Sequence, residues 1–119
     1  MICDLFMEQD RLYIQHILDA ISTIEGYIQN FDFEMFLKNK LVQDGIIREL
    51  EIIGEASKNL SSDFKNSLKE ISWKDVMGMR DKLIHEYFGV DLEAVWQTVQ
   101  EDLPPLKNSL IKPLKNNRT

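Results

Sequence analysis

The polar and apolar positions of this chain alternate with the period of an α-helix along almost its whole length. From about Glu8 to Gln29, apolar residues recur every three or four positions, which predicts one long helix with a single buried stripe. The stripe consists of Ile14, Ile17, Leu18, Ile21, Ile24 and Ile28. No segment alternates with the two-residue period of a half-buried strand, so the chain is predicted to be all-α.

The next segments predict further helices of unequal length. After a turn at 30–32, a short helix is expected over Phe33–Lys38 and a long one from about Lys40 to Leu60. The inner face of the long helix is predicted to carry Ile46, Ile47, Leu50, Ile53 and Ser57. Ser61 and Ser62 offer an N-cap for a short helix that ends near Leu68.

A last helical region is expected to begin near Asp91, and Pro104 and Pro105 predict a break or kink within it. These elements together predict a four- to five-helix up-down bundle. At 119 residues the chain is expected to form a single domain over 1–119, with loose termini at 1–7 and 115–119.

Composition and charge limit the functions that the chain is expected to have. The lone Cys3 cannot form an intrachain disulfide, which fits the reducing cytoplasm, and neither a signal peptide nor a membrane span is predicted. A formal net charge of −6 argues against a protein that coats nucleic acid, but it leaves room for a nuclease with a small basic groove. The basic C-terminal cluster is interpreted as a solvated tail; it consists of Lys107, Lys112, Lys115 and Arg118.

The segment from Trp73 to Trp96 contains the candidate chemistry. A helix is predicted over about 73–88, with Ser72 and Asp75 as a capping box, Gly89 as its stop and Asp91 as the cap of the next helix. The candidate site residues lie in its second half: Arg80, Asp81, His85 and Tyr87.

The spacing of these residues leaves two interpretations open. Asp81 and His85 are four residues apart and face each other, whereas Arg80 and His85 are separated by about 140° around the helix. They can form a catalytic group, in which Asp81 orients His85 and Arg80 reaches the same groove. Alternatively, Asp81 and His85 are a surface pair, and Arg80 bridges to another carboxylate.

Metal and cofactor motifs are missing from the sequence. Two histidines without a cysteine cluster do not make a zinc site, and the E-x-x-H spacing of helical two-metal sites does not occur. The phosphate-binding motif G-x-x-x-x-G-K is also absent. We therefore expect neither a metal nor a cofactor.

The string G-M-R-D-K-L-I-H-E-Y-F-G-V-D at 78–91 resembles the HEPN superfamily, in particular the HepT-like toxins with the signature R-x-x-x-x-H-x-Y. The similarity extends to Y-I-Q-H-I-L-D-A-I at 13–21 and I-R-E-L-E-I-I-G-E-A-S-K at 47–58. It implies a metal-independent endoribonuclease that acts as the toxin of a type VII-like toxin–antitoxin system. In this role His85 moves protons, Arg80 holds the RNA phosphate, and Asp81 supports His85.

The resemblance also implies partners. HepT-like toxins are expected to form homodimers with two motifs facing one groove, and Trp73, Met77 and Met79 could serve either that interface or the core. The implied antitoxin is an MntA-like minimal nucleotidyltransferase that attaches AMP to the tyrosine of the motif, here Tyr87. The alternative for Tyr87 is that its ring simply packs.

Two other functions remain open on the sequence. The chain could be a non-catalytic binding partner or substrate-binding subunit of a minimal nucleotidyltransferase, or a plain dimerisation module. The complete set of Arg80, His85 and Tyr87 favours the enzyme, because a scaffold has no physical need for it.

Overall fold

In a computed structural model, the protein is described over residues 2–79 and 91–116, with side chains described for 8–79 and 91–114. The helices are α1 (Ile2–Ile28), α2 (Phe33–Leu37), α3 (Lys40–Lys58), α4 (Ser62–Ser67), α5 (Trp73–Met77), α7 (Leu92–Gln97) and α8 (Leu103–Asn116). A π-helical segment, η2 (Thr98–Asp102), joins α7 to α8. Within these ranges no residue belongs to a strand, which confirms the all-α prediction.

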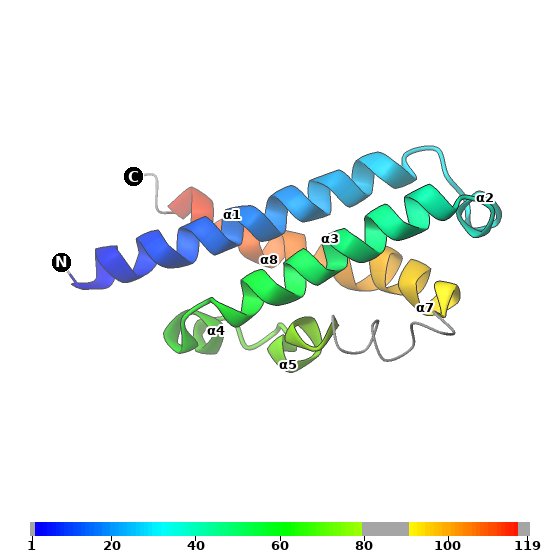
Figure 1. The fold of residues 1–119 in the computed structure, drawn as a ribbon. Helices are drawn as coiled ribbons and strands as arrows, with labels where there is room; N and C mark the ends of the chain where they lie inside the picture. Colours follow the sequence, from blue (N-terminus) through cyan, green and yellow to red (C-terminus); the bar gives the residue numbers. More distant parts are fainter. Residues whose placement is uncertain (1, 80–90, 117–119) are drawn as a thin grey trace.

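The long helices lie along one another in an elongated bundle of 51 × 29 × 21 Å (Figure 1). α1 runs antiparallel to α3 and also to the stretch formed by α7, η2 and α8, while α2 lies at one end of the bundle (Figure 1). The short helices α4 and α5 follow the far end of α3 (Figure 1). Of the helices in the described ranges, none is long and apolar enough to cross a membrane.

The predicted stripe of α1 forms the centre of the core. Ile14, Ile17, Ile21 and Ile24 are almost completely buried, and Leu18 and Ile28 are half-buried against the same core. The inner face of α3 meets this stripe through Ile46, Leu50 and Ile53, which are fully buried, while Ile47 is half-buried. Ser57 is also buried, and its hydroxyl donates to the carbonyl of Ile53 at 2.7 Å, so no polar atom of this side chain is left without a partner.

The prolines of the last region change the helix without ending it. Pro104 and Pro105 lack an N–H, so the carbonyls of Gln100 and Glu101 have no donor four residues on. The helix widens just before them, where the Leu103 N–H donates to the carbonyl of Thr98, five residues back. It then continues as α8 to Asn116, with Pro113 inside. The expected break or kink is therefore a local widening to π-helical geometry.

The interpretation of the basic C-terminal cluster as a solvated tail is wrong for Lys107. Its ammonium group lies 3.0 Å from the carboxylate of Glu25 on α1. Because Lys107 sits on α8 between the buried Leu106 and Leu110, burial of those leucines brings it to α1. The pair is half-exposed, so its contribution to stability is small, on the order of 0–1 kcal/mol.

A buried carboxylate ties the start of α4 to α1. Asp10 is only 3% exposed, and its oxygens accept the N–H of Ser61 at 2.8 Å and the hydroxyl of Ser61 at 2.7 Å. The Ser61 oxygen in turn accepts the N–H of Phe64 at 3.1 Å, which makes Ser61 the N-cap of α4. The Ser61 cap was predicted from the sequence, whereas the role of Asp10 was not.

We predict that Asp10→Ala lowers the free energy of unfolding by about 1–3 kcal/mol, because it leaves two donors of Ser61 without a buried acceptor. Urea unfolding followed by circular dichroism measures this. The matched control is Asp19→Ala, which removes an exposed carboxylate from the same helix and should cost less than about 0.5 kcal/mol. Equal losses in the two variants would contradict a specific role for Asp10.

Candidate functional site

The predicted site residues lie outside the part of the chain that the structure describes. Arg80, Asp81, His85 and Tyr87 all fall within 80–90, as does the predicted stop at Gly89. The structure therefore defines the two flanks of this motif segment, residues 80–90, and the surfaces beside those flanks.

The upstream flank does not form the expected continuous helix. α5 ends at Met77, and Gly78 lies in a turn in which its N–H donates to the carbonyl of Lys74 at 3.0 Å. A Cβ atom on Gly78 would lie only 3.1 Å from that carbonyl oxygen, so glycine permits this tight ending. Met79 is helical again. The prediction of one helix from Trp73 onward is thus wrong at Gly78.

The predicted capping box at the start of α5 is also wrong in its hydrogen bonds. Ser72 is at the N-cap position, but its hydroxyl donates to a carboxylate oxygen of Asp75 at 2.8 Å and accepts no backbone N–H. The carbonyl of Ser72 accepts the N–H groups of Asp75 and Val76 instead, both at 3.1 Å. The side chains of Ser72 and Asp75 therefore hydrogen-bond to each other. The N–H groups of Asp75 and Val76 pair with a backbone carbonyl and not with a side chain.

A buried tryptophan holds the upstream flank against the bundle. Trp73 is 8% exposed and packs against Phe64 of α4, with ring centroids 6.3 Å apart. Val76 is buried beside it, and Met77 and Met79 are half-buried against the same core. The sequence left open whether Trp73, Met77 and Met79 serve a dimer interface or the core. In the described structure all three pack against the core.

The downstream flank is held in a similar way. Asp91 caps α7, as predicted, by accepting the N–H of Ala94 at 3.1 Å. One turn further on, Val95 is fully buried, and the ring of Trp96 packs against Phe36, with centroids 5.2 Å apart. A tryptophan thus fixes each flank to the core within about two helical turns of the motif segment.

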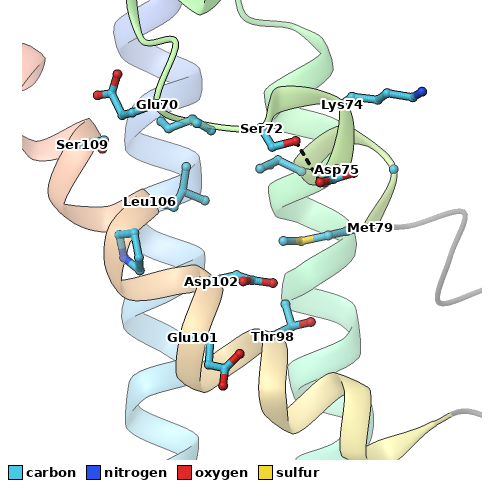
Figure 2. Close-up of a pocket in the computed structure, with 14 residues that line it drawn as sticks. Glu70, Ser72, Lys74, Asp75, Met79, Thr98, Glu101, Asp102, Leu106 and Ser109 are labelled. Carbon is cyan, nitrogen blue, oxygen red and sulfur yellow. Dashed lines mark hydrogen bonds between the residues drawn. The ribbon is translucent and has the colours of Figure 1, made fainter.

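A cavity of about 620 Å³ opens beside the upstream flank, between α5 and the stretch formed by η2 and α8 (Figure 2). Its lining includes Met79, the residue that directly precedes Arg80. Among the residues that the structure describes, its charged lining consists of four acidic side chains and one basic one; these are Glu70, Asp75, Glu101, Asp102 and Lys74. Sequence reasoning missed this group, because its members are separated by up to 32 positions and share no local pattern.

A second, shallower cavity of about 440 Å³ lies between α1 and α3 on the surface of the bundle. His16 lines it, with its exposed ring edge-on to that of Tyr13 at 6.0 Å, and Arg48 lies across from it on α3. Glu51 and Glu55 line the same cavity, so its charges are mixed. Among the side chains that the structure describes, no group of three or more His, Cys, Asp or Glu residues is placed to hold a metal ion.

Comparison with known proteins identifies relatives across most of the chain. A family model described as ribonuclease HepT-like matches residues 17–112. A probable ribonuclease HepT from Thermococcus cleftensis is 51% identical over 100 residues, which is 84% of this chain and 91% of that protein. A protein of Caldanaerobacter subterraneus, described as a candidate RNase, is 38% identical over 112 residues, 94% of this chain and 100% of the relative.

A further relative is about twice as long as the matched region. It is a Methanocaldococcus jannaschii protein whose name combines gamma-glutamylcyclotransferase with a candidate RNase. It is 42% identical over 114 residues, which cover 91% of this chain but 51% of that protein. No solved structure matches the chain.

Proposed function

This chain belongs to the HepT-like ribonuclease family and is an RNA-cleaving enzyme, and from that premise we propose that it is the toxin of a type VII-like toxin–antitoxin system. The observation that carries the proposal is the sequence R-x-x-x-x-H-x-Y at 80–87, inside a chain matched by the HepT-like family over 17–112. The proposed toxin acts in the cytoplasm, where RNA is available and the lone Cys3 stays reduced.

The proposed reaction needs no metal. The ribose 2′-hydroxyl attacks the adjacent phosphorus, so the enzyme must take a proton from that hydroxyl and give one to the leaving 5′-oxygen. His85 is suited to either step, because the unperturbed pKa of histidine lies near neutrality. Arg80 can bind the phosphate through two N–H groups and offset the charge that develops in the transition state, and Asp81 supports His85.

A homodimer would supply the second acid–base group. A single motif contains one histidine, whereas the reaction uses both a base and an acid. Two-fold symmetry would place two copies of His85 and Arg80 across one groove. Two arginines in one place would also give a local positive potential on a chain with a net charge of −6.

The proposed antitoxin is an MntA-like minimal nucleotidyltransferase. It transfers AMP from ATP to the hydroxyl of Tyr87: the tyrosine oxygen bonds to the α-phosphorus, pyrophosphate leaves, and the hydroxyl proton is released. An attached AMP adds a base and a phosphate charge near Arg80 in the sequence, and that phosphate would compete with RNA for the guanidinium group. The second candidate function is a non-catalytic binding partner of such a transferase. It would share the partner but show no RNA cleavage.

We predict that His85→Ala lowers the rate of RNA cleavage by about 10²–10⁴-fold and that Arg80→Ala lowers it by about 10²–10³-fold. Both variants should also lose growth inhibition. Gel assays on labelled RNA measure the rates, and circular dichroism checks that the helical content is unchanged.

The chain provides matched controls for these substitutions. His16 is its only other histidine and Arg48 lies on the surface of α3, so His16→Ala and Arg48→Ala should cleave RNA at the wild-type rate. If folded His85→Ala protein still cleaved RNA at full rate, the catalytic assignment would be wrong. Cleavage by the wild type should also persist in EDTA, and a requirement for added Mg²⁺ would contradict the metal-free mechanism.

We predict that the protein sediments as a homodimer at micromolar concentration and that the dimer contains a shared active site. Mixing wild type with an excess of folded His85→Ala protein should then lower the activity per wild-type chain, because a mixed dimer has only one His85 in the groove and lacks the second acid–base group. A fully active monomer, or an activity that depends only on the amount of wild type in the mixture, would contradict a shared site.

We predict that Tyr87→Phe remains toxic but escapes neutralisation by the nucleotidyltransferase, because the variant keeps the ring and loses only the acceptor oxygen. Mass spectrometry of wild type co-expressed with the transferase should find AMP on the peptide that contains Tyr87. Tyr27→Phe, which removes a hydroxyl from the α1 surface, is the matched control and should be neutralised like wild type. A Tyr87→Phe toxin silenced as fully as wild type would reject the modification site.

A further inference from the structure

A lysine and a methionine join α4 to the upstream flank of the motif segment. The ammonium group of Lys65 on α4 donates to the sulfur of Met77, the last residue of α5, with 3.4 Å between nitrogen and sulfur. The same group donates to the carbonyl of Ser57 near the end of α3, also at 3.4 Å. Lys65 and Met77 are both half-buried. The ammonium group thus bridges α3, α4 and α5.

Neither of these two acceptors matches the strength of the donor. An ammonium group has three N–H bonds to donate, and its strongest hydrogen bonds are formed with charged oxygen atoms. A thioether sulfur is only a weak acceptor. The Ser57 carbonyl is 3.4 Å away, which is beyond the usual range of about 2.7–3.2 Å for an N–H···O bond. A half-buried cation therefore lies beside a sulfur atom that would be a better acceptor if it carried an oxygen.

A methionine sulfur gains such an oxygen by oxidation to the sulfoxide. With hydrogen peroxide, a sulfur lone pair attacks one peroxide oxygen and the O–O bond breaks. The proton on the transferred oxygen passes to the leaving hydroxide, so the products are methionine sulfoxide and water, with sulfur oxidised and peroxide reduced by two electrons. In an apolar core this change is disruptive, because a flexible apolar side chain becomes polar. Beside Lys65, the polar S–O bond instead finds an ammonium donor.

We propose that Met77 is a site of reversible oxidation by peroxide, and that Lys65 binds the sulfoxide oxygen through a charge-assisted hydrogen bond. Met77 is only half-buried, so its side chain is partly open to a small oxidant, and the flexible stem of Lys65 lets the ammonium group move to make room for the oxygen. The oxidised form keeps α5 attached to α4, and a methionine sulfoxide reductase restores the thioether. Met77 lies three positions before Arg80, so the modification acts on the upstream flank. The proposal does not rest on the nuclease mechanism.

The test compares melting temperatures before and after treatment with hydrogen peroxide, while tandem mass spectrometry distinguishes Met77 from Met79. Each protein is paired with a version that also contains Met77→Leu, so that the loss caused by the other methionines is subtracted. Beyond that loss, complete oxidation of Met77 should lower the melting temperature of wild type by less than about 1 °C. It should lower that of Lys65→Leu, which offers the sulfoxide no donor, by about 3–6 °C. The control Lys69→Leu removes an exposed lysine after α4 and should behave like wild type.

Lys65→Arg provides a second variant, which keeps both the charge and the donors. It should therefore tolerate the oxidation of Met77 as wild type does. Equal additional losses of melting temperature in wild type and Lys65→Leu would overturn the proposal. So would a folded wild-type protein in which Met77 stays unmodified under conditions that fully oxidise Met35, whose side chain is 45% exposed.

Discussion

The burial of the isoleucine stripe of α1 against α3 is the contact on which the rest of the structure depends. Each fully buried isoleucine or leucine contributes about 1.5–3 kcal/mol, so Ile17, Ile21 and Ile24 together match the net stability of a small domain, about 5–15 kcal/mol. The short helices α2 and α4 are attached to this pair of helices and cannot be stable alone at five and six residues. α4 is held by the buried Asp10 of α1, and α8 also packs against α1.

The chain is fixed to this core on either side of the motif segment. Trp73 packs into α4 on the upstream side, and Trp96 packs onto Phe36 of α2 on the downstream side. A nuclease must hold its catalytic groups to within a fraction of an ångström, and anchored ends limit the positions open to the residues between them. Loss of either anchor would therefore affect the proposed chemistry without touching a catalytic side chain.

The sequence by itself determined the features that are encoded within a few turns of helix. The three- and four-residue spacing of isoleucines gave the buried faces of α1 and α3, and single polar residues gave the caps at Ser61 and Asp91, because these signals act locally. The family motif at 80–87 is likewise a local string.

Tertiary structure decided the rest. Gly45, which weakens a helix, lies where a Cβ would be 2.9 Å from the ring of Tyr27, and Glu25 meets Lys107 from 82 positions away. The cavity between α5 and the stretch formed by η2 and α8 is lined by residues of 70–79 and of 98–109. No local sequence pattern encodes these long-range contacts, because they depend on how whole helices pack.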